Sequence, residues 1–246
     1  MGLGAVGALA AAVTTGVYVN GNQKAAPAAL AERIGAASET VCVESNVRLV
    51  EGMSSGCFSA AQYEALRDRA VIDGAGENLN VNLAAPDTGG EDATAGTCAE
   101  FDALTDKGWY ALSGADMRRE EYFRRACGAL SMLAAAKPAQ STHFAGGKAD
   151  PADIRSMALQ ESTGFGETEP SASVAVDEIE ERVWKVTIGN GETLIYEIAH
   201  ADFTGDGLGE ILAYVSVGAA GGTARTGTIG LLEKPSEGGP CAFTAR

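Results

Sequence analysis

Hydrophobic and polar positions follow two different spacings along the chain, and the change falls near residue 171. Before it, apolar residues recur every three or four positions in several segments, which is the spacing of one face of an α-helix. After it, five segments alternate between apolar and polar residues, as strands with one buried face do. These segments read SASVAVDEI, RVWKVTI, TLIYEIAHADF, GEILAYVSV and TGTIGLLEK. Because short connections favour antiparallel pairing, the pattern predicts an α+β fold, with a helical N-terminal region followed by a C-terminal antiparallel β-meander.

Three helices are predicted from their capping residues and apolar faces. Ser59 and Thr97 are each placed to cap a short helix. Ser113 is placed to cap a long helix that ends before Pro138, because proline lacks the N–H group that a helix interior needs. Ser113 and Asp116 resemble a capping box with aspartate in place of the usual glutamate. The apolar face of the long helix consists of Phe123, Cys127, Leu130 and Ala134.

The predicted elements divide the chain into four parts. Residues 1–25 are expected to be a signal peptide or an N-terminal anchor, and residues 26–140 a helical region that contains disulfides. Residues 141–170 are expected to form a linker, and residues 171–246 the antiparallel sheet. One short alternating run, residues 41–51, predicts a strand within the mainly helical region.

The segment from Met1 to Val19 carries no charged side chain, which is typical of the apolar part of a signal peptide or of an anchor helix. Two features depart from a signal peptide: no Lys or Arg follows Met1, and no small-x-small cleavage site precedes Asn20. The alternative is a buried helix rich in alanine and glycine. Export is the preferred interpretation, with a periplasmic or secreted location.

Five cysteines are dispersed along the chain, and no two of them form a C-x-x-C pair. This spacing argues against zinc-finger and thioredoxin-type motifs, and in an exported chain it favours disulfides. The preferred pair is Cys98 with Cys127, because both lie on predicted helix faces that are close in sequence. Cys42 with Cys57 is the second choice, which leaves one cysteine free or intermolecular. The alternative is that all five are buried thiols.

Acidic residues outnumber basic residues by 33 to 18, which gives a net charge of −15. A field of this sign repels phosphate backbones and anionic membrane surfaces. Nucleic acid is therefore not an expected partner. Membrane contact is expected only through the N-terminal segment, if that segment is not cleaved. The same acidity suits divalent cations.

The segment between the third and fourth predicted strands has the spacing of a calcium loop. Asp202, Thr204, Asp206 and Glu210 place side-chain oxygens at positions 1, 3, 5 and 9, and the carbonyl of Leu208 lies at position 7. Calcium typically binds six to eight oxygens and mixes carboxylates with carbonyls, so this alternation suits it. An EF-hand is excluded, because position 12 carries no acid and the flanking segments are predicted strands.

The motif Asp202-Phe-Thr-Gly-Asp206-Gly-Leu-Gly-Glu210 resembles the calcium loop of FG-GAP and VCBS-type repeats, written D-x-[DN]-x-D-G-x-x-[DE]-[IL]. The resemblance covers residues 202–214 closely and residues 183–233 loosely, as one blade-like sheet. In that family the loop joins neighbouring strands of a propeller blade. The chain as a whole resembles exported proteins of Gram-negative bacteria that carry a single loop of this kind.

The resemblance implies a set of calcium ligands. The side-chain ligands would be Asp202, Thr204, Asp206 and Glu210, and Leu208 would contribute its backbone carbonyl. Threonine replaces the family's usual Asn or Asp at position 3, which weakens that position. Only one copy of the motif is present, so this chain does not form a whole propeller. The alternative is a metal-free turn, in which Asp and Gly act as turn formers.

Residues 52–56 match the G-x-S-x-G pattern of a serine nucleophile, with Ser54 at the centre. A nucleophile elbow needs a helix that starts at the serine within a parallel sheet, whereas the helix here is predicted at Ser59. No catalytic or cofactor-binding residue is therefore assigned. The preferred interpretation is a non-enzymatic protein whose calcium-stabilised hairpin supports binding or envelope structure. The alternative is an exported serine hydrolase that uses Ser54 with His143 or His200 as its base.

Overall fold

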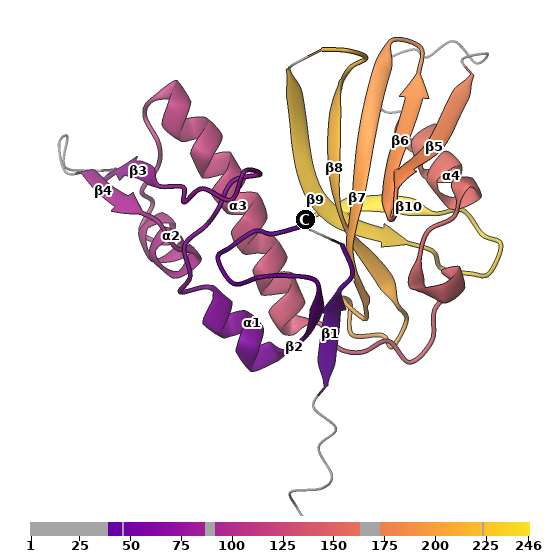
Figure 1. Ribbon diagram of the computed structural model, residues 1–246, viewed down its shortest axis with the longest axis horizontal. Helices are drawn as coiled ribbons and strands as arrows, with labels where there is room; N and C mark the ends of the chain where they lie inside the picture. Colours follow the sequence, from indigo (N-terminus) through magenta and orange to yellow (C-terminus); the bar gives the residue numbers. More distant parts are fainter. Residues whose placement is uncertain (1–38, 46, 87–91, 163–172, 223) are drawn as a thin grey trace, which may run out of the picture. The chain divides into compact units, whose positions relative to one another are not determined.

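The computed structural model (Figure 1) describes residues 39–45, 47–86, 92–162, 173–222 and 224–246. The expected signal peptide or anchor, residues 1–25, lies outside the described residues. The helices are α1 (Ala60–Leu66), α2 (Cys98–Thr105), α3 (Gly114–Ala135) and α4 (Pro151–Ser162), with a 3₁₀ turn at Ala145–Gly147. The strands are β1 (Thr40–Val43), β2 (Gly56–Ser59), β3 (Val81–Ala84), β4 (Asp92–Ala95), β5 (Val174–Glu180), β6 (Val183–Ile188), β7 (Gly191–Ala201), β8 (Glu210–Ala219), β9 (Arg225–Glu233) and β10 (Ala242–Ala245).

The framework is an antiparallel sheet of eight strands, in which β7 pairs with three others, β8, β6 and β1. One edge of β7 pairs with β8 along nearly its whole length. The other edge is shared: β6 pairs with the first half of β7, and β1 pairs near its end, at Ala199. The order is therefore β10-β9-β8-β7-β1-β2, with β6 and then β5 continuing from the first half of β7. A separate hairpin joins β3 to β4.

The mixed α+β class is confirmed, and strands β5 to β9 correspond to the five alternating segments of the sequence. The layout differs from the prediction in two places. Strands β1 and β2 come from the region expected to be helical, yet they extend the C-terminal sheet. The segment expected to be a linker, residues 141–170, contains α4, which packs against the sheet. From residue 39 onward the described residues therefore form one compact unit.

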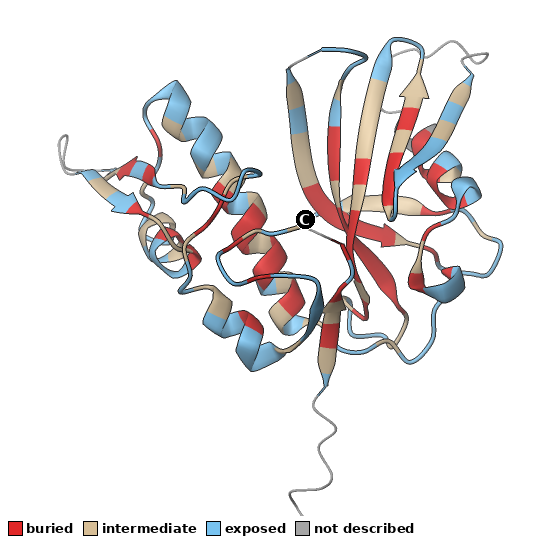
Figure 2. Cartoon of the chain, in the orientation of Figure 1, coloured by how far each residue is buried: buried red, intermediate tan, exposed pale blue. Residues whose placement is uncertain are grey.

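Two hydrophobic cores lie on opposite faces of this sheet, and both appear as buried segments in Figure 2. Because successive strand residues point to opposite faces, β8 contributes to both: Leu212 packs in the first core and Ile211 in the second. The second core joins the sheet to α4 through Ile154 and Met157. The first core joins the sheet to the buried residues of α3, which are Phe123, Ala126, Cys127, Ala129, Leu130 and Leu133.

All three predicted N-caps are confirmed. In each, the hydroxyl of the cap accepts a hydrogen bond from the backbone N–H three residues later. The pairs are Ser59 with Gln62, Thr97 with Glu100, and Ser113 with Asp116. Caps of this kind typically contribute about 1 kcal/mol each. The long helix α3 ends at Ala135, shortly before Pro138, as expected.

Both predicted disulfides are present. Cys42–Cys57 links directly opposed residues of β1 and β2, and Cys98–Cys127 links α2 to α3. Their sequence separations are 15 and 29, and in the chain-entropy account closing such loops destabilises the unfolded chain by roughly 3 kcal/mol each. Cys241 is a buried free thiol, and burial raises its pKa to about 12, so it stays protonated.

Within the helices that the structure describes, none combines the length and apolar character needed to cross a membrane.

Candidate functional site

The connection between β7 and β8 is the segment predicted to be a calcium loop. β7 ends at Ala201 and β8 begins at Glu210, and these two residues are partners in the antiparallel register. Because Asp202 directly follows Ala201, the strands fix the positions of the first and last acids of the motif. Gly205 and Gly207 have φ angles of +86° and +87°, which glycine adopts without the strain that a side chain would cause.

Three carboxyl groups meet inside this loop. Asp202, Asp206 and Glu210 each offer one oxygen, and these atoms all lie within 4.8 Å of one another. Asp202 and Glu210 are only 5% and 4% exposed, whereas Asp206 lies at the surface. Two unit charges 4 Å apart repel by about 1 kcal/mol in water and by about 4 kcal/mol at the effective dielectric of a protein surface. A cation bound among the three groups would replace this repulsion with attraction.

The backbone of the loop holds two of these carboxylates. Asp202 accepts hydrogen bonds from the N–H of Gly205 at Oδ1 (2.6 Å) and from the N–H of Gly207 at Oδ2 (2.9 Å). Asp206 accepts one from the N–H of Leu208 (2.8 Å). Metal-free turns contain the same kind of bond, but each carboxylate oxygen has a further lone pair. The arrangement is therefore compatible with both a bare turn and a metal site.

Glu210 completes the cluster from the first position of β8. Its Oε2 accepts a hydrogen bond from the N–H of Phe203 (2.8 Å), and its Oε1 accepts one from the hydroxyl of Thr204 (3.1 Å). Burial raises the pKa of Glu210, and the negative charges of Asp206 and Asp202 raise it further, although the two hydrogen bonds oppose this shift. A bound cation would favour the ionised carboxylate.

The loop is also fastened to residues 137–142, the segment that follows α3. Five backbone hydrogen bonds of 2.8–3.2 Å join them: Lys137 N–H to Asp202 O, Asp202 N–H to Lys137 O, Gln140 N–H and Ser141 N–H to Gly207 O, and Gly209 N–H to Ser141 O. The calcium-type loop therefore connects the end of α3 to two central strands of the sheet.

Sequence reasoning did not find this supporting segment, because it lies far from the motif along the chain. One local signal points to its backbone conformation. Pro138 disfavours a helical conformation for Lys137, and Lys137 pairs in extended conformation with Asp202. The identity of the partner could not be read from that signal.

The structure brings together three of the five predicted ligands, Asp202, Asp206 and Glu210. Thr204 lies beside them, with its hydroxyl bonded to Glu210. Leu208 is in the loop, with its N–H bonded to Asp206. Metal coordination by Thr204 and by the Leu208 carbonyl stays a prediction.

Ser54 does not have the surroundings of a nucleophile elbow. It is exposed, the chain continues into β2 at Gly56, and α1 begins only at Ala60. β2 is paired antiparallel, whereas an elbow belongs to a parallel sheet. In the described ranges, no hydrogen bond joins Ser54 to a histidine, and His200 bonds instead to the hydroxyl of Thr142 (2.9 Å).

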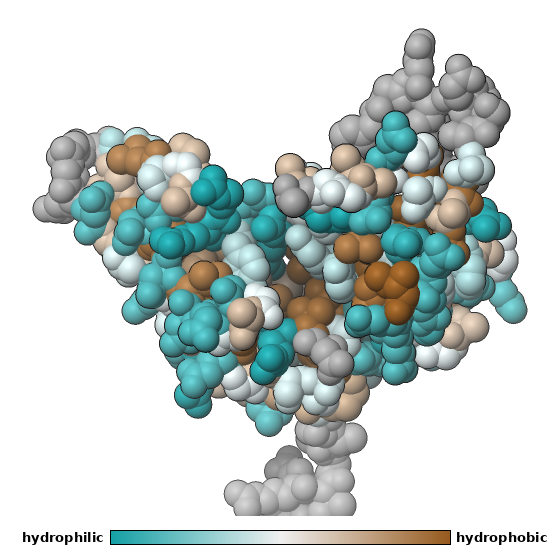
Figure 3. All heavy atoms as spheres, turned by 45° about the horizontal axis from the view of Figure 1, so that its top comes forward, coloured by the Kyte–Doolittle hydropathy of each residue, from teal (hydrophilic) through white to brown (hydrophobic). Residues whose placement is uncertain are grey.

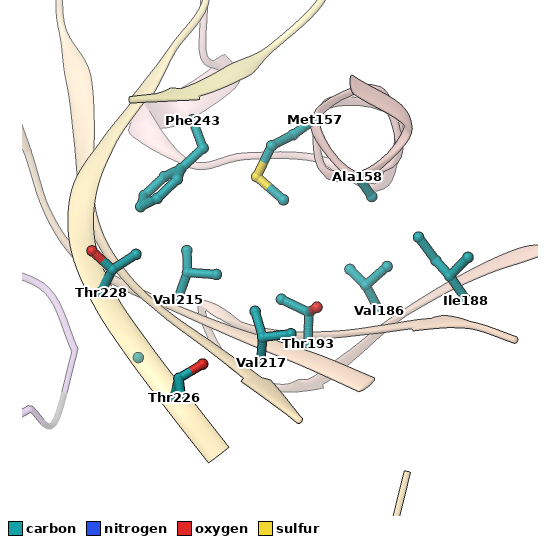
Figure 4. Close-up of a pocket in the computed structure, with 11 residues that line it drawn as sticks. Met157, Ala158, Val186, Ile188, Thr193, Val215, Val217, Thr226, Thr228 and Phe243 are labelled. Carbon is teal, nitrogen blue, oxygen red and sulfur yellow. The ribbon is translucent and has the colours of Figure 1, made fainter. Parts of the chain in front are cut away.

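A hollow of about 400 Å³ lies between α4 and the facing strands (Figure 4). Met157 and Ala158 line it from α4, and Phe243 lines it from β10. Its remaining wall consists of Val186, Ile188, Thr193, Val215, Val217, Thr226, Gly227 and Thr228. None of these lining side chains titrates near neutral pH, so the hollow offers apolar contact and hydroxyl groups but no acid–base chemistry.

No protein-family model matches the chain, and comparisons with curated proteins and with solved structures give no significant match.

Proposed function

We propose that this protein is an exported bacterial protein without catalytic activity, in which a calcium ion held by the β7–β8 loop stabilises a sheet that serves binding or envelope structure. The observation that carries the proposal is the convergence of Asp202, Asp206 and Glu210 within 4.8 Å. Calcium is favoured over other divalent ions because it prefers hard oxygen donors and tolerates irregular geometry.

Five groups of the loop would hold the ion. They are the carboxylates of Asp202, Asp206 and Glu210, the hydroxyl of Thr204 and the carbonyl of Leu208. Asp202 and Glu210 are buried and fixed by the ends of the two strands, so they would form the rigid part of the site. Asp206 is exposed and would close it from the solvent side. The bound ion would supply the positive charge that offsets the mutual repulsion of the three carboxylates.

The role of the ion in this proposal is structural. Backbone hydrogen bonds join the loop to residues 137–142, which follow α3 in the chain, and Phe203 within the loop packs against the first core. An ion that orders the loop would therefore order the junction between α3 and the central strands.

Two features support export. Disulfides persist in oxidising compartments such as the periplasm and the exterior of the cell, and this chain carries two. The segment from Met1 to Val19 has the charge-free composition of a secretion signal or an anchor. N-terminal sequencing of the protein from its native host distinguishes the two: cleavage removes this segment, and an anchor retains it.

The arrangement of strands supports the resemblance to a single propeller blade. Strands β6 to β9 follow one another as antiparallel neighbours, and the calcium-type loop joins the two in the middle. We propose that these strands form one blade-like sheet that is completed by α1–α3 on one face and by α4 on the other, instead of by further blades.

Calcium calorimetry with Asp206→Ala tests the metal part of the proposal. Asp206 is exposed, so its removal takes away a charged ligand without opening the core. We expect one-site binding of calcium to the wild type and at least roughly tenfold weaker binding to Asp206→Ala, because a carboxylate is the strongest type of ligand in the set. Asp177→Ala, which removes an exposed acid on β5, should bind like the wild type.

Two results would contradict this assignment. Absence of binding heat in the wild type, together with no rise in its melting temperature on adding calcium, would leave the loop as a metal-free turn. Equal affinities of the wild type and Asp206→Ala would place the ion elsewhere.

A further inference from the structure

A second hollow, of about 290 Å³, opens between α3 and the face of the sheet opposite to α4. We call it the tyrosine hollow and define it by Arg48, Asp73, Tyr122, Arg125, Tyr196 and Tyr214. In Figure 3, hydrophobic residues are visible in the recess between the helical elements and the sheet, with hydrophilic residues around them. The hollow contains no residue of the calcium-type loop and is independent of it.

Aromatic rings form much of its lining. Tyr196 and Tyr214 are direct partners of β7 and β8, with ring centroids 5.8 Å apart and planes inclined by 31°. Tyr122 lines the hollow from α3. Burial raises the pKa of both Tyr122 and Tyr196, so these hydroxyl groups stay neutral at physiological pH. The rings offer flat apolar surfaces on which another ring can stack.

These side chains are held in place by the protein itself. Tyr214 lies directly over Gly227 of β9, where an added Cβ would be only 2.1 Å from the tyrosine hydroxyl, so any larger residue there would displace the ring. The guanidinium of Arg125 lies 5.8 Å from the centre of the Tyr214 ring and donates to the carbonyl of Gly227 (2.9 Å). The hydroxyl of Tyr122 donates to the carbonyl of Ile72 (2.7 Å). A site ordered in advance loses little conformational entropy when a ligand binds.

Two arginines, Arg48 and Arg125, and one aspartate, Asp73, line the hollow. Arg125 is already paired with Glu121 (2.5 Å), and Oδ1 of Asp73 accepts hydrogen bonds from two N–H groups of its own turn. None of the ion pairs found among the described residues involves Arg48. Arg48 lines the hollow together with the tyrosines, and one of its guanidinium nitrogens lies close to Gly76, so the side chain supplies a positive charge at this rim in a chain with a net charge of −15. Arginine recognises carboxylates through two parallel hydrogen bonds.

We propose that the tyrosine hollow binds a small aromatic carboxylate, with its ring against Tyr196 and Tyr214 and its carboxylate directed to Arg48. The volume lies just below the usual range for small-molecule sites, about 300–1,000 Å³, so it suits one ring with a short acidic chain. The tyrosines supply the contact area, and the arginine selects the acid over a neutral analogue.

The test compares 3-phenylpropionate with its neutral amide, 3-phenylpropanamide, by saturation-transfer difference NMR and calorimetry on the full chain. We expect the acid to bind at least about fivefold more tightly than the amide, because only the acid forms a charge-assisted bond with the guanidinium. Arg48→Gln should remove this difference and leave amide binding unchanged. Tyr214→Leu should weaken both probes. Arg69→Gln, which neutralises an exposed arginine outside the hollow, should bind like the wild type.

Each other outcome overturns part or all of the proposal. Absence of binding of both probes up to millimolar concentration overturns it entirely. Equal affinity for acid and amide, or an undiminished preference in Arg48→Gln, removes the role of the arginine. Tighter binding of glucuronate than of 3-phenylpropionate removes the preference for an aromatic ring. Because Arg48 is exposed, Arg48→Gln keeps the test valid even if Tyr214→Leu does not fold.

Discussion

Glu197 on β7 is the most deeply buried carboxyl group among the residues that the structure describes, with 1% of its surface exposed. Trp184 donates its indole N–H to Oε1 (2.6 Å), and Arg182 donates from its guanidinium to Oε2 (3.2 Å). Burial raises the pKa of Glu197 to about 7, although both of these donors lower it. This carboxyl group therefore changes its charge near neutral pH.

The raised pKa of Glu197 predicts a pH-dependent stability. Because the folded state binds this proton more tightly than the unfolded chain, the stabilising contribution is complete below pH 4.5 and is lost as the pH rises through 7. The loss is at most about 3 kcal/mol in the free energy of unfolding. Urea unfolding between about pH 5 and about pH 8 should show this fall, and Glu197→Gln should flatten it.

Two comparisons isolate the effect of Glu197. Glu180→Gln removes an exposed acid on β5 and should leave the pH dependence unchanged. His200 acts in the opposite direction, because burial lowers its pKa, so its contribution is present above pH 6.5 and is lost as the pH falls. Since His200 is present in the wild type, in Glu197→Gln and in Glu180→Gln, its effect on the pH dependence cancels when these proteins are compared. Identical pH dependence of the wild type and Glu197→Gln would contradict the prediction.

At the scale of elements, the sequence predicts those features that depend on residues close together along the chain. Strands β5 to β9 have six residues or more and alternate clearly, whereas β1, β2 and β10 have four residues each. The alternation of residues 41–51 indicates a strand but not its partner, because Val43 pairs with the distant Ala199. The same limit applies to the candidate site. The three acids belong to one short motif and were found, but the segment that pairs with the loop was not, because that contact is long-range.

A buried ion pair fastens α4 to the end of β9. Lys234 and Asp153 are 2.6 Å apart, and their side chains are 9% and 4% exposed. The ammonium group also lies 5.9 Å from the centre of the Phe144 ring in the second core. Loss of one partner would leave the other charge buried without compensation, which typically costs about 3–5 kcal/mol.

We therefore expect Asp153→Leu alone and Lys234→Met alone to lower the free energy of unfolding by about 3 kcal/mol or more each. The free energy of unfolding of the double variant should fall by less than that of either single variant, because apolar residues of similar volume replace both charges. Denaturant unfolding of the four proteins measures the difference. Arg124→Ala is the control, because it breaks an exposed ion pair on α3, between Arg124, which is 60% exposed, and Glu120. It should lower the free energy of unfolding by well under about 1 kcal/mol. A double variant that loses the sum of the single effects would show that the two charges do not depend on each other.

For the molecule as a whole, the shared sheet determines how stability is distributed. Both cores rest on it, and β1 from the N-terminal region pairs with β7 of the C-terminal region. The chain has two tryptophans, one for each core: Trp109 packs against the first, and Trp184 is buried in the second. Two independent domains would respond separately to a ligand of the β7–β8 loop. One cooperative unit would respond as a whole.

The shared sheet predicts that calcium, if it binds the loop as proposed, stabilises both cores equally. At about 100 times its Kd a ligand adds about 2.7 kcal/mol to the free energy of unfolding. Thermal unfolding followed by fluorescence in Trp109→Phe and in Trp184→Phe isolates one reporter in each protein. Trp184→Phe loses the bond to Glu197 and starts from lower stability, so the calcium-induced shifts are compared and not the midpoints. Because β7 and β8, the two strands joined by the loop, each contribute residues to both cores, the two shifts should be equal. A shift confined to the Trp184 reporter would contradict the coupling while leaving the metal site intact, and the absence of both shifts would contradict the metal site itself.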